Sequence, residues 1–277
     1  MNILKKVFLL FLFTINLIAG ERIITLSPSI NEIVFALGNG KDIVANTKFC
    51  NFPEESKKIP KIGGYASISL EKMLVAKPTL VLAQDYDNEL ILNIKKLKLN
   101  VKTFKTNNLK SIKNTISSIG MLLKKNEKAD ELNNGIDNSL ENIKNIISNK
   151  KILVVISPRE DLNKIIYVAG NNLYFNDIIE ASGNKNAYVS SSLSQPIVNV
   201  EKIIKMNPDV IIMLAPYINE RKISHDDMKK PWLGLPINAA KEKMVYIIDK
   251  EYAGIPSNRV VNFINDFRNI LEDVRSK

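Results

Sequence analysis

The sequence predicts an α/β protein of two Rossmann-like lobes, with central, mostly parallel sheets, joined by a long rigid interdomain helix. Short apolar runs that stop at a proline alternate with amphipathic helical segments, as expected for parallel strands with helices on both faces of the sheet. The whole pattern then occurs a second time further along the chain. A length of 277 residues suits two lobes of about 120 to 130 residues each.

Residues 1–20 are expected to be a secretory signal peptide. Lys5 and Lys6 give a positive start, an apolar run follows at 7–13, and small residues end the segment. The apolar run is shorter than the ~20 residues of a membrane-spanning helix. We therefore expect a soluble, exported protein. The lack of a cysteine near the cleavage region favours a form without a lipid anchor.

Each lobe is expected to begin with a buried strand. In the N-terminal lobe, residues 21–123, this strand is IITLS at 23–27. In the C-terminal lobe, residues 150–277, it is ILVVIS at 152–157. Both runs are followed at once by a proline, which is typical of a parallel strand that ends in a turn.

A capped helix, a proline and a second buried strand then occur in both lobes, as SLEKMLVAKPTLVL (69–82) and NVEKIIKMNPDVII (199–212). Equivalent residues lie 130 positions apart in three pairs: Pro28 and Pro158, Glu71 and Glu201, and Pro78 and Pro208. Three landmarks at one spacing indicate two homologous lobes. Because ligands gather at the carboxyl ends of such strands, we expect a site in the loops after Ser27, Leu82, Ser157 and Leu214.

The connection between the lobes is expected to be helical. Residues 107–149 lack proline and carry apolar side chains at helical spacing, which predicts one broken helix or two consecutive helices. We assign the linking helix itself to residues 124–149. A helical connection is stiffer than a loop, so large opening motions between the lobes are not expected.

The chain has one histidine and one cysteine. These counts exclude a multi-histidine metal site, an internal disulfide and a CxxC redox pair. We expect Cys50 to be a small buried residue and His225, which lies among charged residues in a predicted loop, to be solvated. No metal site formed by the protein itself is expected.

The basic charge does not indicate a nucleic-acid partner. The net charge of +10 falls to +8 once the two lysines of the signal peptide are removed. Lysine pairs at 57–58, 124–125 and 229–230 are scattered and mostly lack an aromatic platform. We therefore interpret these lysines as solvated surface and expect no nucleic-acid partner.

Catalytic motifs are missing from the sequence. It contains no GxSxG elbow, P-loop, GxGxxG that opens a helix, or HExxH. We therefore expect the protein not to be an enzyme. An exported α/β enzyme stays as the rival hypothesis, which a perturbed acid–base pair converging with a nucleophile in the cleft would favour.

The segments RIITLSPSINEIVFALG (22–38), SLEKMLVAKPTLVLA (69–83) and PWLGLPINAAKEKMVYII (231–248), with the repeat around Glu201, resemble the helical-backbone class of periplasmic substrate-binding proteins. That class serves ABC importers of vitamin B12, iron-siderophores and haem. The resemblance implies a periplasmic monomer that binds its ligand between the lobes and delivers it to an ABC permease dimer with its ATPase. It implies cobalamin or a related corrinoid as the ligand, with a ferric siderophore or haem as the alternative. Any metal would arrive inside the ligand, so no cofactor of the protein's own is expected.

The same resemblance implies two docking residues. In the class, a glutamate near the start of a helix in each lobe pairs with arginines of the permease. Glu71 in SLEK and Glu201 in NVEK match those positions. An acid in the first turn of a helix is also favoured by the helix dipole alone, which is the alternative interpretation.

Three tyrosines match cleft positions of the cobalamin binders: Tyr65 in GGYASISLE and, by a looser alignment, Tyr167 in IIYVAG and Tyr252 in DKEYAG. Such rings can cover a flat macrocycle and still offer a hydroxyl, although each could instead be a packing residue. The chain departs from the cobalamin binders at Gln195, where they have tryptophan. Its own tryptophan, Trp232, is expected to be structural.

Loops supply further candidates for ligand contact. Asp85 and Tyr86 follow the buried strand that ends near residue 83, where ligand contacts are expected. Phe49, with Phe52 close by in KFCNFP, is another candidate, and core packing is the alternative for both rings.

Two arginines complete the candidate site. Arg159 follows the first strand of the second lobe, and Arg259 lies in PSNRVV. Arginines in the cleft would suit an anionic ferric catecholate or a haem propionate through bidentate contacts. Arg259 could instead tie down the last helix.

Overall fold

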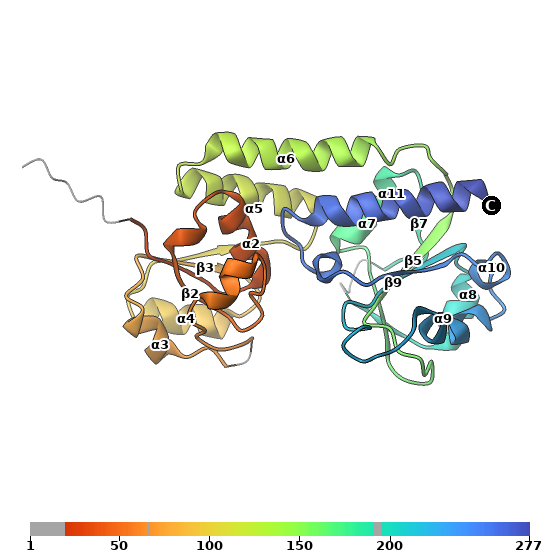
Figure 1. Ribbon diagram of the computed structural model, residues 1–277, viewed down its shortest axis with the longest axis horizontal. Coiled ribbons are helices and arrows are strands. Elements are labelled where there is room, and N and C mark those ends of the chain that lie inside the picture. The colour runs from red at the N-terminus through yellow and green to blue at the C-terminus, as the bar shows by residue number, and fades with distance from the viewer. Residues whose placement is uncertain (1–19, 66, 191–194) are drawn as a thin grey trace, which may run out of the picture.

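The computed structural model describes residues 20–65, 67–190 and 195–277. Two lobes lie side by side, and helices α5 (Leu109–Leu122), α6 (Asn126–Glu141) and α11 (Val260–Ser276) form a layer along one side of them, at the top of Figure 1. The predicted signal peptide at 1–20 lies outside the described residues except for Gly20. Among the residues described, no helix is long and apolar enough to cross a membrane.

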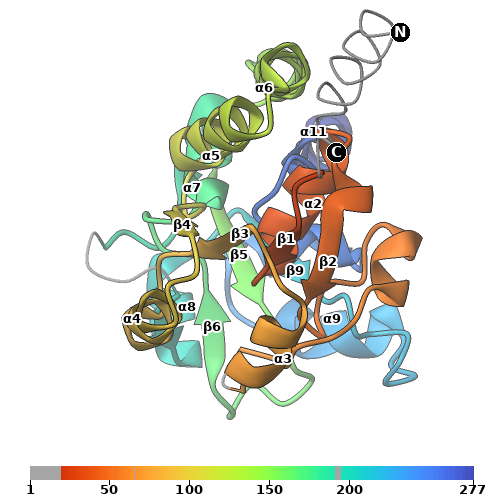
Figure 2. The ribbon, with the colours of Figure 1, turned by 90° about the vertical axis from the view of Figure 1, so that its left-hand side faces the viewer.

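The N-terminal lobe contains a parallel four-stranded sheet in the order β2-β1-β3-β4. Its strands are β1 (Ile23–Thr25), β2 (Ile43–Asn46), β3 (Leu80–Gln84) and β4 (Val101–Phe104). Its helical segments are α2 (Pro28–Ala36), η1 (Gly40–Asp42), η2 (Glu54–Lys58), α3 (Leu70–Val75) and α4 (Asn88–Lys96). Helices α2 and α5 cover one face of the sheet, and α3 and α4 cover the other (Figure 2).

The C-terminal lobe contains a mixed sheet in the order β10-β9-β5-β6-β8, and β7 also pairs with β5. Its strands are β5 (Lys151–Ile156), β6 (Ile166–Val168), β7 (Lys185–Asn186), β8 (Ile197–Val198), β9 (Val210–Leu214) and β10 (Val245–Ile248). Strand β6 runs antiparallel to β5 and β8, and the other pairs are parallel.

Helices cover both faces of this second sheet. They are α7 (Tyr174–Ala181), α8 (Val200–Met206), α9 (His225–Leu233), α10 (Asn238–Lys241), η3 (Glu251–Gly254) and α11. Helices α7 and α11 pack on one face, and α8, α9 and α10 pack on the other. The predicted α/β fold with two lobes and mostly parallel sheets is confirmed.

The repeated helix and strand are also confirmed. Helix α3 is capped by the Ser69 side chain, which accepts from the Lys72 N–H at 3.2 Å. Helix α8 is capped in the same way by Asn199, which accepts from the Lys202 N–H at 2.9 Å. Each helix leads into a buried strand, β3 or β9, that lies beside the first strand of its lobe.

The linking segment contains two consecutive helices, one of the two arrangements predicted for 107–149, but the linking helix assigned to 124–149 is shorter than predicted. Helix α5 ends before Lys124, whose φ of +56° is left-handed, and α6 ends at Glu141. Asn145 and Asn149 have φ of +59° and +61°, which a continuing helix does not allow. The connection is therefore a hairpin of two helices followed by an irregular segment.

Both lobes share one hydrophobic core along the helical layer. The cluster of buried side chains includes Ile33 and Ile116 from the N-terminal half of the chain and Ile178, Ile212 and Phe263 from the C-terminal half. Because close-packed cores resist deformation, this continuous packing fixes the lobes against each other on the side of α5, α6 and α11.

Candidate functional site

A pocket of about 560 Å³ lies between the two lobes. The N-terminal lobe lines it with residues that follow β3 and β4, and the C-terminal lobe with the start of α7 and the segment after η3. The lining residues are Gln84, Asp85, Tyr86, Lys105, Thr106, Asn107, Leu173, Tyr174, Phe175, Gln195, Gly254 and Pro256. This interlobe pocket has the size of a small-molecule site and lies at the carboxyl ends of parallel strands, as the sequence predicts.

A second pocket of about 360 Å³ lies on the C-terminal lobe. Its lining residues are Ile156, Ser157, Arg159, Tyr167, Gln195, Tyr217 and Arg221. Gln195 lines both pockets, so the two adjoin there. Together they form a cleft that receives side chains from the strand ends of both lobes.

Three aromatic rings form a ladder on the N-terminal lobe. Phe49 stacks on Tyr65 with 4.8 Å between ring centroids, and Tyr65 lies 6.2 Å from Tyr86. The three side chains, here called the aromatic ladder, are between 49% and 56% exposed. Tyr86 lines the interlobe pocket, so the ladder continues from that pocket along the lobe. The Tyr86 ring is tilted by 57° to the Tyr65 ring, so the row offers a ligand an apolar but uneven surface.

The tyrosines of the ladder stay protonated at neutral pH. Burial raises the pKa of the Tyr65 and Tyr86 hydroxyls above the usual value of a phenol. Each can therefore donate a hydrogen bond while its ring makes apolar contact.

Two glycines allow the ladder to form. Gly63 has φ of +132°, and a Cβ there would lie 1.9 Å from the carbonyl oxygen of Ser67. A Cβ on Gly64 would lie 3.1 Å from the Phe49 ring. Gly63 is thus required by a tight turn, and a side chain at Gly64 would crowd the Phe49 ring.

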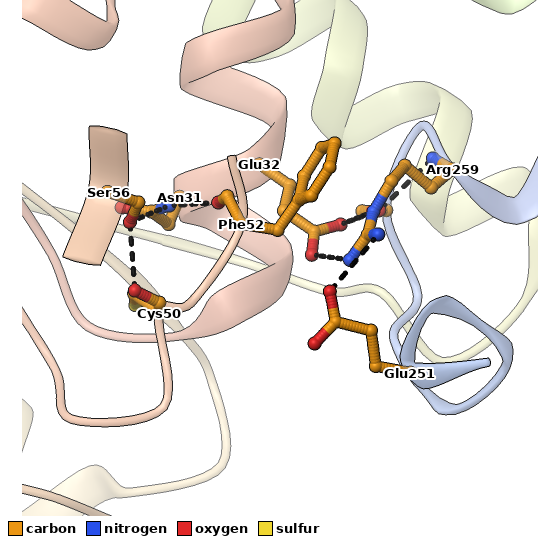
Figure 3. Close-up of polar contacts among 8 residues, drawn as sticks. Asn31, Glu32, Cys50, Phe52, Ser56, Glu251 and Arg259 are labelled. Atoms are coloured by element: carbon orange, nitrogen blue, oxygen red, sulfur yellow. Dashed lines mark hydrogen bonds and ion pairs between the residues drawn. The ribbon is translucent and has the colours of Figure 1, made fainter. Parts of the chain in front are cut away.

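A buried polar network holds the loop that carries Phe49 and Phe52. The Asn31 amide of α2 donates to the Phe52 carbonyl at 3.0 Å and to Ser56 Oγ at 2.9 Å, and Ser56 donates to the Cys50 carbonyl at 2.9 Å (Figure 3). Lys61 Nζ donates to the same Cys50 carbonyl at 3.1 Å. Burial lowers the pKa of Lys61, whose bonds in this network go to neutral oxygens. The side chains of Asn31 and Ser56 thus fix the backbone of this loop by hydrogen bonds.

The C-terminal side of the cleft carries two arginines. Arg159 and Arg221, here called the basic pair, are exposed and line the second pocket. The Arg221 guanidinium lies over the Tyr217 ring, 4.1 Å from its centroid, and the Tyr217 hydroxyl donates to the Pro158 carbonyl. Neither arginine forms an ion pair within the described part of the chain. The basic pair is therefore free to contact an anion.

Arg221 and Tyr217 were not among the residues selected from the sequence. Both lie in the segment that follows β9, and the loop after Leu214 is one of the four predicted to meet the ligand. The end of β9 therefore indicated this loop as a place for ligand contacts, although no residue of the loop was predicted to contact the ligand.

Arg259, a predicted ligand contact, lies in an ion pair between the lobes. Its side chain is 8% exposed and forms a bidentate ion pair with Glu32, which is 3% exposed. Because both guanidinium and carboxylate are buried against each other, Arg259 lines neither pocket. Burial raises the pKa of the Glu32 carboxyl, and the hydrogen bonds from Arg259 oppose that shift.

Tyr252 also lies outside both pockets. Its hydroxyl donates to Asp266 of α11 at 2.7 Å, and its ring packs against the shared core. The other predicted ligand contacts, Tyr65, Tyr86, Tyr167, Phe49, Asp85 and Arg159, lie along the cleft or on the ladder.

Other residues considered in the sequence lie outside the cleft. Glu71 and Glu201 are exposed, and each is the second residue of its helix. Trp232 is fully buried and Cys50 is 1% exposed. His225 is half exposed as predicted, but it begins α9 rather than lying in a loop, 3.5 Å from Asp249. Within the described residues, no group of three or more His, Cys, Asp or Glu side chains could hold a metal ion.

The sequence is similar to those of known binding proteins. Residues 23–252 match the family model described as periplasmic binding protein. The vitamin B12-binding protein of Vibrio vulnificus strain CMCP6 is 26% identical over 263 residues, which is 91% of each chain.

Solved structures show the same fold. The periplasmic vitamin B12 binding protein BtuF of Vibrio cholerae has a TM-score of 0.78 at 18% identity, covering 93% of this chain and 98% of BtuF. The periplasmic haem binding protein HutB of the same organism has a TM-score of 0.76 at 18% identity, covering 91% and 98%.

The chain belongs to the periplasmic binding protein family. The family and these relatives are substrate-binding transport proteins, so the protein is a binding protein and not an enzyme. Membership also implies a location outside the cytoplasm. The resemblance found in the sequence is confirmed.

Proposed function

We propose that the protein is the periplasmic substrate-binding component of an ABC importer and that it captures cobalamin or a related corrinoid between its lobes. The aromatic ladder of Phe49, Tyr65 and Tyr86 beside the interlobe pocket carries this proposal. Three exposed rings in a row offer apolar contact to a broad macrocycle, and the hydroxyls of two of them suit polar groups at its edge. The similarity to vitamin B12-binding proteins over 91% of the chain supports the same ligand.

The protein itself performs no chemistry in this proposal. It binds the chelate with its metal already inside, and the permease and its ATPase supply the energy of transport. A signal peptide at residues 1–20 would direct export to the periplasm, where the protein acts as a monomer. Glu71 and Glu201 would contact one permease subunit each.

An anionic iron chelate, either haem or a ferric siderophore, is the second candidate ligand. The basic pair favours it, because Arg159 and Arg221 line the second pocket without an ion-pair partner in the described chain. Guanidinium groups bind carboxylates and catecholate oxygens through charge-assisted hydrogen bonds. Haem-binding proteins such as HutB share the fold.

Uptake by cells that lack this gene distinguishes the two candidates. If the protein serves corrinoid import, uptake of labelled cyanocobalamin falls and is restored by the cloned gene. Normal cyanocobalamin uptake together with reduced haem or ferric siderophore uptake would favour the second candidate. Normal uptake of all three would contradict the proposal.

A further inference from the structure

The ion pair between Glu32 and Arg259 joins the two lobes at a buried place. Glu32 belongs to α2 of the N-terminal lobe, and Arg259 immediately precedes α11 of the C-terminal lobe. Arg259 Nε donates to one carboxylate oxygen at 3.0 Å and Nη2 donates to the other (Figure 3). Two parallel bonds between a planar guanidinium and a planar carboxylate fix orientation as well as distance.

The N-terminal side of this pair is connected to the aromatic ladder. The Arg259 guanidinium lies 3.7 Å from the centroid of the Phe52 ring. Phe52 belongs to the loop that carries Phe49, and Asn31, the neighbour of Glu32 on α2, donates to the Phe52 carbonyl. Two adjacent residues of α2 therefore have different partners. Asn31 holds the loop that carries Phe49, and Glu32 holds Arg259 of the other lobe.

The C-terminal side of the pair is connected to the interlobe pocket. Ser257 Oγ donates to the Glu32 carboxylate, and Gly254 and Pro256, just before it, line the pocket. Arg259 also lies 3.5 Å from Glu251 at the start of η3. The segment from Glu251 to Arg259, which forms part of one cleft wall, is thus anchored to a helix of the opposite lobe.

We propose that Glu32 and Arg259 are a positioning pair that sets the separation of the two cleft walls and through it the affinity for the ligand. The shared core, which includes Ile33 and Val260 beside the pair, packs the lobes together, and the ion pair adds bonds of fixed geometry to this contact between α2 and the start of α11. Bonds of fixed geometry restrict a hinge motion that apolar packing alone would allow. The dependence of affinity on the pair rests on the proposed function, whereas its effect on lobe separation does not.

The distance between the lobes in the ligand-free protein tests the proposal directly. Spin labels on Lys96→Cys of α4 and Lys205→Cys of α8, both exposed positions, report that distance in a Cys50→Ala background. We expect Glu32→Gln to broaden or shift the distribution measured by double electron–electron resonance. Arg259→Lys, which keeps the charge but loses the bidentate geometry, should give a smaller change in the same direction. An unchanged distribution in either folded variant would overturn the proposal.

Titration with cyanocobalamin provides the second readout. Glu32→Gln is expected to weaken binding at least tenfold, and Arg259→Lys to weaken it less. Ile211→Val is the matched control, because this fully buried residue of β9 packs in a core cluster within the C-terminal lobe and lines neither pocket of the cleft. If the control lowers the melting temperature and the affinity as much as Glu32→Gln does, the pair has a merely structural role. Absence of cyanocobalamin binding by the unmodified protein would contradict the proposed ligand, and the label distances would still decide the role of the pair.

Discussion

Glu71 and Glu201 occupy equivalent positions in the two lobes, each as the exposed second residue of a short helix capped by the side chain two residues earlier. Their helices, α3 and α8, both lie away from the layer of α5 and α6 (Figure 1). Two equivalent acidic side chains suit a partner with two equivalent basic sites.

Replacing both glutamates with alanine is expected to abolish uptake and to leave ligand affinity unchanged. Neither residue lines a pocket, and loss of one partner from a desolvated interface ion pair costs about 2 to 5 kcal/mol. Uptake of labelled ligand and the Kd of the purified variant are the two measurements. Glu127→Ala is the matched control, since Glu127 is the exposed second residue of α6. Normal uptake by the double variant would refute the docking role.

Removing the middle ring of the aromatic ladder should weaken ligand binding. Tyr65→Ala eliminates the stacking on Phe49 and the contact with Tyr86. Full burial of a side chain such as Phe contributes about 1.5 to 3 kcal/mol, and a ligand would cover only the exposed half of Tyr65. We therefore expect the Kd to rise about three- to tenfold. Tyr65→Phe, which keeps the ring and loses only the hydroxyl, should raise the Kd less than Tyr65→Ala does. Equal affinity of Tyr65→Ala and the unmodified protein would exclude the ladder from the site.

The basic pair should distinguish anionic from neutral ligands. Replacing Arg159 and Arg221 with glutamine removes two cationic donors from the second pocket, and a hydrogen bond to a charged group contributes about 1.5 to 3 kcal/mol. If the ligand is haem, its affinity should fall about a hundredfold. Cyanocobalamin, which carries mainly amide side chains and a single phosphodiester anion, should lose much less affinity than haem. An equal loss of affinity for both ligands would contradict this assignment of the two arginines.

The thiol of Cys50 should be unreactive in the folded protein. Burial raises its pKa, so the folded state favours the protonated thiol, and we expect alkylation by iodoacetamide at pH 8 to be roughly a hundredfold slower than in urea. Because the folded pKa is raised, the associated stability is present below the unfolded pKa of about 8.5 and is lost as the pH rises through the folded pKa. Equal alkylation rates in the folded and unfolded protein would show that the loop around Cys50 opens readily.

The elements built on local patterns were predicted well. A capping side chain, an amphipathic helix, a proline and an apolar run are adjacent in the chain, so Ser69 and Asn199 identified the starts of α3 and α8. The end of α6 was predicted less well, because Ile143 and Ile147 continue the helical spacing although they pack into the shared core from an irregular segment.

Contacts between distant residues were not predictable in the same way. Glu32 and Arg259 are 227 positions apart, and nothing near either residue indicates that the two lobes bring them together. An arginine near the start of the last helix suits ligand binding and interlobe pairing equally well in the sequence. Only the packing of α2 against the segment before α11 decides between them.

Calorimetric titration of the mature protein with cyanocobalamin, haemin and a set of ferric siderophores identifies the ligand of the cleft. Cyanocobalamin is expected to bind with a stoichiometry of one, and Tyr65→Ala is expected to weaken this binding. Haemin or ferric siderophore binding without cyanocobalamin binding would contradict the corrinoid assignment. Failure of every one of these ligands to bind would contradict the claim that the cleft receives a metal chelate.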